Sequence, residues 1–366
     1  MGITVNNSEE KRPFKRIPIS RAALGMELAQ DIYSRNNQVI LNKHSILDAQ
    51  KISKIMFYSI DTIIVYEPEE EESEDLSLVQ QLKSSVEFRE FSKNYDHAVS
   101  ALQNTINAMI TEGTEIDEDY LISEVDRMVG ASGSRTNVFN MLHCIREYDE
   151  MTYMHSVNVS LIAGCFAKWL ELGEESERML TLAGLLHDIG KTVIPREIIL
   201  KPDSLTAEEY KIVKTHTLRG YELLKEKKID DRVKMAALQH HERADGSGYP
   251  FGKSGEQIES FAMIIAIADV YDAMTSDRIY RPRVCPFDVV KMLQNDDAHK
   301  YNPKFLIPLL EQITQVFINH NVRLSNNQVG KIVLLNNAEL SKPVVQVDDI
   351  FVDLAKNRDI KIAEII

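Results

Sequence analysis

Histidines and aspartates of one stretch of this 366-residue chain could together do metal chemistry. Five of the ten histidines fall in predicted helices or at helix ends, and two aspartates join them: His155, His187, Asp188, His216, His240, His241 and Asp269. Imidazole and carboxylate groups without thiolates suit borderline-hard divalent metals such as iron, manganese, zinc or nickel. The residue types therefore predict a metal site, although their spacing does not say which metal binds.

Taken alone, His155 has two interpretations. It precedes Val159, Ile162 and Phe166 by four, seven and eleven positions, so it lies on the helix stripe that should face the core. A core histidine with satisfied hydrogen bonds would show the same pattern. His216 is ambiguous in the same way, and both gain weight only together with the other candidates.

The pair His187-Asp188 ends a helix predicted over residues 179–189, with Gly190 as the expected C-cap. Adjacent helical residues point about 100° apart, yet at a final turn both can reach a common pair of ions. Asp188 could then bridge two metals. Ordinary helix ends also carry such dipeptides, so the pair alone is weak support.

The segment HHERADGSGYP, residues 240–250, is more specific. Two consecutive histidines at a helix end, His240 and His241, can project towards two neighbouring ions. Two glycines and a proline then set a tight loop that places Tyr249 beside them. The alternative is a surface turn after a helix.

Asp269 favours the metal interpretation. It interrupts the apolar run AMIIAIADVYDAM, where burial of an unpaired carboxylate is costly unless a cation or strong donors compensate it. A metal ligand explains this position.

The elements that must position these groups are predicted to be mainly α-helical. Apolar residues at three- and four-residue spacing predict helices over 78–111, 117–129, 137–147, 151–172, 174–188, 206–225, 230–240, 255–275 and 286–294. The first part of the chain combines β-prone pieces, 38–41 and 62–66, with a helical pattern over 46–57. The pieces 331–335 and 344–347 predict strands near the other end.

Three motifs together resemble the signature of the HD-GYP subgroup of HD-domain phosphohydrolases. They are HDIGK at 187–191, HHERADGSGYP at 240–250 and IADVYDAMTSDRIYR at 267–281. The resemblance covers roughly half of the chain, in the family's order. It implies an all-helical bundle with a two- or three-metal centre, often iron, and cyclic di-GMP as substrate, cleaved to pGpG and then GMP.

The resemblance also assigns roles to residues. The implied metal ligands are His155, His187, Asp188, His216, His240, His241 and Asp269. The implied substrate-binding residues are Lys191, Tyr249, Arg278 and Arg281, with catalytic roles for Asp188 and Lys191. Lys191 could instead be a helix C-terminal charge, the two arginines solvated surface residues, and Tyr249 a packing residue.

Two departures from the family pattern matter. Met151 stands one helical turn before His155, where some three-metal members present a carboxylate, and Asp149 and Glu150 are out of that register. We therefore expect two divalent ions, with iron or manganese favoured. Ile279 replaces a proline common in the DR-x-YR segment, which removes no ligand.

The predicted domain order follows from these patterns. It comprises a small α+β regulatory module over 15–66, an acidic linker over 67–78, a helical connector over 79–147, the HD-GYP catalytic domain over 148–322 and a short β-rich C-terminal appendix over 323–366. The segment RIPISRAALGMELAQDIY resembles the small domain often seen ahead of such cores. Like-charge blocks such as EPEEEESED rarely fold, hence the linker.

The composition restricts the partners. A formal net charge of -14 argues against duplex DNA or RNA and requires a local basic or metallic site for an anionic substrate. Three dispersed cysteines suggest no disulfide framework, and no signal core or membrane span is apparent. We expect a cytoplasmic enzyme whose first module senses, regulates or assembles, through a homodimer or a regulatory protein. The alternatives are an HD phosphohydrolase for another nucleotide and a non-catalytic cyclic di-GMP sensor.

Overall fold

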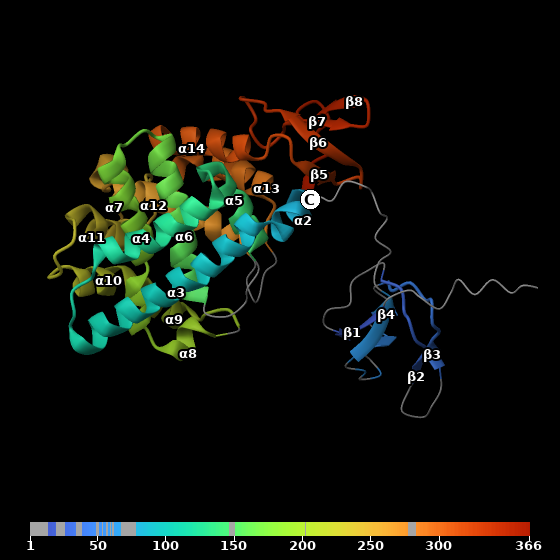
Figure 1. The fold of residues 1–366 in the computed structure, drawn as a ribbon, viewed down its shortest axis with the longest axis horizontal. Coiled ribbons are helices and arrows are strands. Elements are labelled where there is room, and N and C mark those ends of the chain that lie inside the picture. The colour runs from blue at the N-terminus through green and yellow to red at the C-terminus, as the bar shows by residue number, and fades with distance from the viewer. Residues whose placement is uncertain are drawn as a thin grey trace, which may run out of the picture. The chain divides into compact units, whose positions relative to one another are not determined.

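The computed structural model of this chain describes residues 14–19, 26–33, 39–48, 51–52, 54–55, 58, 60, 62–66, 78–145, 151–201, 203–276 and 283–366. The chain divides into two compact units, Met1–Asp75 and Leu76–Ile366, with elements labelled in Figure 1. The acidic run at 67–75 lies outside the described residues.

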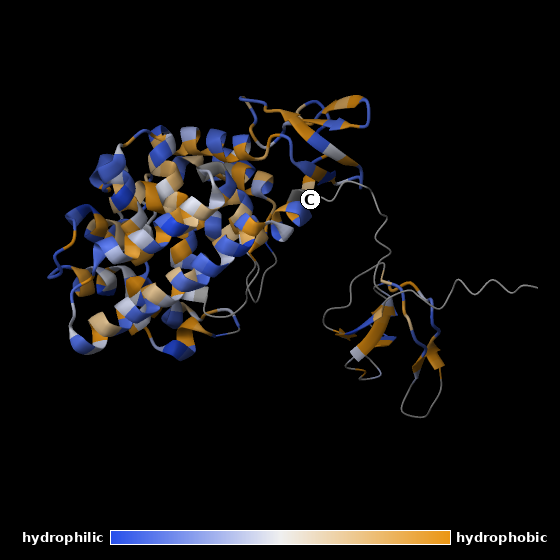
Figure 2. Ribbon diagram, viewed as in Figure 1, coloured by the Kyte–Doolittle hydropathy of each residue, from blue (hydrophilic) through white to orange (hydrophobic). Residues whose placement is uncertain are grey.

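The first unit contains two small antiparallel sheets. Strand β1 (Phe14–Pro18) pairs with β4 (Thr62–Tyr66), and β2 (Ile32–Tyr33) pairs with β3 (Val39–Leu41). Alternate residues of β4, which is largely orange in Figure 2, enter a separate apolar core. Of the predicted helix over 46–57, positions 51–52 and 54–55 are helical, whereas 46–48 are not.

Helices dominate the second unit, as the sequence predicted. They are α2 (Leu78–Ser84), α3 (Val86–Glu112), α4 (Glu118–Ser132), α5 (Arg135–Cys144), α6 (Met151–Trp169), α7 (Glu174–Leu186), α8 (Arg196–Ile199), α9 (Ala207–Lys214), α10 (His216–Leu224), α11 (Asp231–Gln239), α12 (Ser260–Thr275), α13 (Pro286–Lys291) and α14 (Pro303–Val316). Short 3₁₀ segments are η2 (Ile189–Val193), η3 (Gly255–Gln257) and η5 (Ala298–Lys300), and η4 (Met292–Asp296) is a π-helical turn.

Three predicted helices begin or break at capping residues that the sequence did not indicate. The run 78–111 is broken at Ser85, whose side chain accepts a hydrogen bond from the Phe88 amide and so caps α3. The run 206–225 is broken at Thr215, so that His216 begins a new helix. Helix α12 begins at Ser260, because the Glu259 side chain caps it, and not at residue 255.

Helix α6 is central to the bundle. It packs against α3, α4, α5, α7, α12 and α14, and its residues are apolar on most sides, which is typical of a buried helix. Val159, Ile162 and Phe166 are all buried, so the stripe that carries His155 does face the core.

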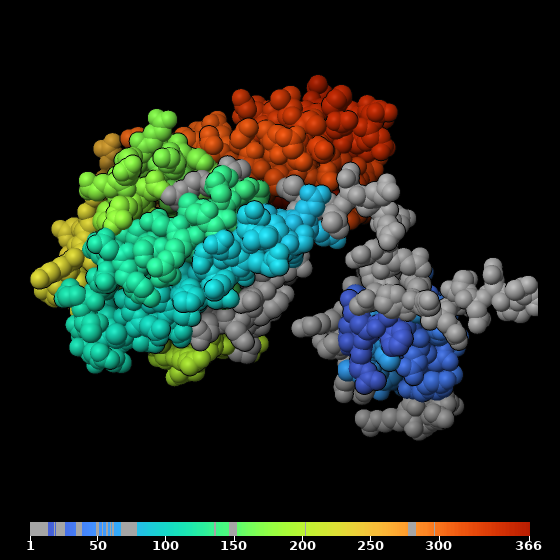
Figure 3. All heavy atoms as spheres, in the orientation of Figure 1, coloured from blue at the N-terminus to red at the C-terminus, as the bar shows by residue number. Residues whose placement is uncertain are grey.

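A five-stranded antiparallel sheet follows α14 in the order β8-β7-β6-β5-β9. Its strands are β5 (Asn321–Leu324), β6 (Val329–Leu334), β7 (Val344–Val347), β8 (Ile350–Asp353) and β9 (Ile362–Ile365). The sequence predicted β6 and β7 but missed the other three. The sheet shares one hydrophobic core with the helices, and Figure 3 shows it, in red, packed on the helical body.

The predicted fold class, mainly α with a small α+β part before the bundle and a β part after it, is confirmed. The predicted domain boundaries stay predictions. Within the described part of the chain, none of the helices combines the length and the apolar character that a bilayer crossing requires.

One close backbone approach in this fold can be tested by substitution. A β-carbon at Gly190, in η2, would overlap the carbonyl oxygen of His216 at the start of α10. We expect Gly190→Ala to destabilise the second unit by about 1–3 kcal/mol, because backbone must move to admit the methyl group. Urea unfolding followed by circular dichroism measures this change.

Gly130→Ala provides the matched control. Gly130 lies in α4, where a β-carbon would have no neighbouring atom within 4 Å, so this change should leave stability equal or raise it by up to about 1 kcal/mol. Equal stability of the two variants would contradict the close approach between η2 and α10.

Candidate metal centre

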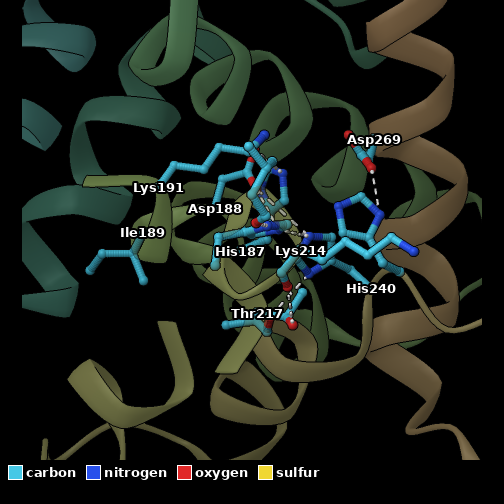
Figure 4. A network of polar contacts seen from close by, with 12 residues as sticks. His187, Asp188, Ile189, Lys191, Lys214, Thr217, His240 and Asp269 are labelled. Atoms are coloured by element: carbon cyan, nitrogen blue, oxygen red, sulfur yellow. Dashed lines mark hydrogen bonds and ion pairs between the residues drawn. The ribbon is translucent and has the colours of Figure 1, made fainter. Parts of the chain in front are cut away.

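The predicted ligands come from five separate elements. Helix α6 supplies His155, the turn after α7 supplies His187 and Asp188, α10 begins with His216, the end of α11 supplies His240 and His241, and α12 supplies Asp269. Figure 4 shows His187, Asp188, His240 and Asp269 in one network. The structure therefore brings all seven predicted side chains into one cluster.

One detail of the sequence interpretation is wrong. Helix α7 ends at Leu186, not at residue 189, and Gly190 lies inside η2 and not at a left-handed C-cap. The turn from α7 into η2 projects Asp188 into the cluster. The missing side chain of Gly190 matters because it lets α10, and with it His216, approach this turn.

The side chains form two overlapping groups with metal-ligand spacing. Asp188, His216, His240 and His241 form one group, and His155, His187 and Asp188 form the other. Within each group the candidate ligand atoms lie within 4.8 Å of one another. Asp188 belongs to both groups, which is the geometry expected of a carboxylate that bridges two cations.

Hydrogen bonds to the backbone orient three of the imidazoles. The Nδ1 atoms of His187 and His216 lie 2.7 Å from the carbonyl oxygens of Gly184 and Val213, and Nδ1 of His240 lies 3.0 Å from that of Ala236. A carbonyl oxygen only accepts, so each Nδ1 must donate its proton. In the neutral form of such an imidazole, Nε2 carries a lone pair that is directed into the cluster.

The candidate ligand atoms of the cluster fit a divalent cation. Nε2 of His216 lies 3.3 Å from Nε2 of His240 and 3.3 Å from Oδ1 of Asp188. Nε2 of His187 and Oδ1 of Asp188 are buried without a hydrogen-bond partner among the described residues. Buried acceptors that face one another with no donor between them are costly, and a bound cation removes this cost.

The aspartate Asp269 connects the two groups. Its Oδ1 lies 3.0 Å from Nε2 of His155, and its Oδ2 lies 3.9 Å from Nδ1 of His241. At 8% exposure it is buried, as the sequence predicted for a carboxylate in this apolar run.

Sequence reasoning missed Asp272, which holds His155 from the other side. Its Oδ2 lies 2.7 Å from Nδ1 of His155, and it is 4% exposed. A carboxylate on the second nitrogen fixes the tautomer and orientation of a ligand histidine. The signal was present, because Asp269 and Asp272 are three residues apart and share one helix face.

The electrostatics of the cluster favour cation binding. Burial lowers the pKa of His216 to about 3 and also lowers the pKa of His240 and of His241, so these imidazoles are neutral. Burial alone would raise the pKa of Asp188 and of Asp269. The charge of Lys191 nevertheless holds the pKa of Asp188 well below its usual range. The hydrogen bond from His155 does the same for the pKa of Asp269. Neutral imidazoles beside ionised carboxylates are the ligand states that divalent metals require.

His155 differs from the other histidines. Burial alone would lower its pKa, but its hydrogen bonds to Asp269 and Asp272 outweigh burial and raise the pKa to about 9. A cation that took Nε2 of His155 as a ligand would therefore displace a proton.

The loop after α11 places Tyr249 beside the cluster, as predicted. Its ring stacks on that of His241 with 4.7 Å between centroids. A β-carbon at Gly248 would overlap the backbone of residues 241–243, so the tight turn depends on glycine there. Glu242, which sequence reasoning missed, is buried and accepts hydrogen bonds from the amides of Phe251 and Lys253 at 2.8 and 2.9 Å.

The other predicted substrate-binding residues have different outcomes. The Lys191 ammonium donates to Oδ2 of Asp188 at 2.5 Å, at the edge of the cluster. Arg278, Arg281 and Ile279 lie outside the described residues, as do Asp149 and Glu150.

Known proteins resemble this chain over its helical part. Residues 138–305 match the model of the HD domain family. The chain is 34% identical over 236 residues to the cyclic di-GMP phosphodiesterase PA4108 of Pseudomonas aeruginosa, across 64% of this chain and 57% of that protein. It is 36% identical over 156 residues to 3'3'-cGAMP-specific phosphodiesterase 1 of Vibrio cholerae, across 43% of this chain and 36% of that protein.

A solved structure has the same fold. The HDG"Y"P protein Bd1817 from Bdellovibrio bacteriovorus superposes with a TM-score of 0.51 and 18% identity, over 82% of this chain and 99% of that chain. At this identity the likeness concerns the fold alone.

The hydrogen bond from His155 to Asp272 yields a prediction. Asp272→Ala should weaken metal binding by about 10- to 100-fold, because His155 loses the carboxylate that fixes its tautomer. Titration of the metal-depleted protein with Mn²⁺, followed by calorimetry, measures the affinity. Asp203→Ala, at an exposed position, is the control, and equal affinities of the two variants would show that Asp272 has no such role.

Proposed function

Because this chain belongs to the HD-domain family, in its HD-GYP subgroup, we propose that it is a metal-dependent phosphodiesterase that hydrolyses cyclic di-GMP to pGpG, GMP or both. The observation that carries the proposal is the shared position of Asp188 in two ligand groups. The names of curated relatives supply the substrate class. The chain spans 57% of the first of these relatives, so the activity of the whole protein is part of the proposal.

The cofactor in this proposal is a pair of divalent ions, with iron or manganese favoured. His216, His240 and His241 would hold one ion and His155 and His187 the other, with Asp188 between them and Asp269 beside both groups. Such ions supply Lewis acidity that generates a nucleophile from water at neutral pH. Met151 occupies the position one helical turn before His155 where a third ion would need a carboxylate, so the sequence favours two ions over three.

The protein's own residues contribute position and charge. Lys191 forms an ion pair with the shared carboxylate of Asp188, so its ammonium is suited to bind a phosphoryl oxygen or to assist proton transfer there. Tyr249, held on His241, is suited to contact a base or a phosphate. Arg278 and Arg281 enter the proposal from the motif alone, as donors to non-bridging phosphate oxygens.

A mixed cyclic dinucleotide is the main alternative substrate. One relative is named as a 3'3'-cGAMP-specific phosphodiesterase, at an identity close to that of the cyclic di-GMP phosphodiesterase. Turnover rates of the metal-loaded protein on the two nucleotides separate these alternatives. A non-catalytic sensor is disfavoured by the full set of converging ligands.

Three further expectations extend the proposal. They are a cytoplasmic location, a regulatory role for the first unit, and a homodimer or a regulatory protein as its partner. The regulatory role is supported by the separate apolar core of the first unit, which makes this unit a candidate for an independent module.

Removal of the shared carboxylate tests the centre. Asp188→Ala should lose most bound metal and reduce turnover of cyclic di-GMP to background, because both ligand groups lose a member. Elemental analysis after anaerobic purification and a product assay measure both effects. Metal content and rate equal to those of the unsubstituted protein would reject the assignment.

Removal of a proposed phosphate donor should act differently. Arg278→Ala should raise KM by about tenfold with metal content unchanged, because a charge-assisted hydrogen bond to the substrate is lost. Steady-state kinetics with cyclic di-GMP measure KM, and Arg358→Ala, at an exposed position, is the control. If both variants behave alike, Arg278 does not contact the substrate.

A further inference from the structure

Lys214 occupies a position beside the metal centre that the family motifs do not explain. It is the last residue of α9, and its ammonium lies 4.7 Å from the ring centroid of Tyr210 and 5.1 Å from that of Tyr249. Tyr249 in turn stacks on His241. The ring of Tyr249 therefore contacts both this cation and a candidate metal ligand.

The main chain at Lys214 is also fixed relative to the centre. The hydroxyl of Thr217 donates to the carbonyl oxygen of Lys214 at 3.2 Å, in the turn that leads into α10 and His216. In the view of Figure 4, His187 and Asp188 lie between Lys191 and Lys214.

Lys214 differs from the neighbouring cations in its partners. Lys191 is bound to Asp188, Arg243 donates to the carbonyl oxygens of His240 and Glu242, and Arg219 donates to that of Val193. Among the described residues, by contrast, no oxygen atom accepts a hydrogen bond from the Lys214 ammonium, which lies over the two tyrosine rings. In a chain with 56 acidic and 42 basic residues, an ammonium without an anion is available to a ligand anion.

We propose that Lys214 is a further substrate-binding residue. When one phosphate of a cyclic dinucleotide lies at the metal centre, the Lys214 ammonium binds the other phosphate. The inference rests on the proposed function. A cyclic dinucleotide carries two phosphodiester groups, and only one of them can be attacked at a time. The second anion also needs a cation. Lys191 is already engaged beside Asp188, and Lys214 would act alongside Arg278 and Arg281, which the motif assigns to phosphate oxygens.

The aromatic neighbours suit the rest of such a substrate. Tyr210 is 48% exposed and lies one helical turn before Lys214. An exposed ring beside a cation offers a stacking surface for a purine next to a site for its phosphate. A bare inorganic phosphate would use the cation but not the ring.

The test compares a substrate with two phosphates and a substrate with one. Lys214→Met removes the charge and keeps an unbranched side chain of similar length, one atom shorter. We expect KM for cyclic di-GMP to rise about tenfold or more, with kcat changed less than about threefold. Hydrolysis of bis(p-nitrophenyl) phosphate, which has one phosphate, should keep its kcat/KM. Lys214→Arg should restore most of the affinity for cyclic di-GMP.

The controls distinguish substrate binding from a structural role. Lys211→Met changes an exposed lysine of the same helix and should leave both substrates unaffected. Metal content and melting temperature are measured for every variant, and Lys214→Gln replaces Lys214→Met if the latter does not fold. An equal loss on both substrates would overturn the inference, because Lys214 would then only hold Tyr249 and the centre.

An unchanged KM for cyclic di-GMP in Lys214→Met would also overturn the inference while leaving the proposed function intact. Failure of the unsubstituted, metal-loaded protein to hydrolyse cyclic di-GMP would instead reject the proposed function, and the role of Lys214 with it.

Discussion

The buried carboxylate of Asp188 is the group on which the account of this protein depends. It is 1% exposed and is faced by imidazole nitrogens that carry lone pairs, because backbone carbonyls occupy the opposite nitrogens of His187, His216 and His240. An anion and several neutral acceptors buried together are unfavourable without a cation. Lys191 supplies one positive charge at the edge, which leaves most of the lone pairs for metal ions.

The fold brings the buried carboxylate and the imidazole nitrogens together although their burial is unfavourable. Each ligand lies at a helix end or on a buried helix face, and the ends are brought together by close approaches such as that of η2 to α10 at Gly190. The loop after α11 is fixed by the buried Glu242, which binds two loop amides and so holds Tyr249 on His241. The single large core that the helices share with the C-terminal sheet offsets the unfavourable burial at the centre.

The sequence predicted the types of ligand and the helices that carry them, because residue chemistry and helical periodicity are local properties. It also predicted the burial of Asp269 from its apolar neighbours.

The sequence missed what depends on tertiary contact. Gly190 was interpreted as a C-cap because glycine has that role in many helices, whereas its function here is to admit the backbone of α10. Asp272 and Glu242 lie within the family motifs but were given no role there, and Lys214 lies outside the motifs. Their contacts with His155, the loop amides and Tyr249 appear only after folding. Strands β5, β8 and β9, each four residues long, were not predicted.

Anomalous diffraction from crystals of anaerobically purified protein tests the central claim most directly. Data collected at the absorption edges of iron and manganese locate the ions themselves, independently of any assay. The account predicts two peaks, one on each side of Asp188, each within coordination distance of one of its oxygens. A crystal grown with these metals present that shows no peak at Asp188, with the histidines in the same positions, would contradict it.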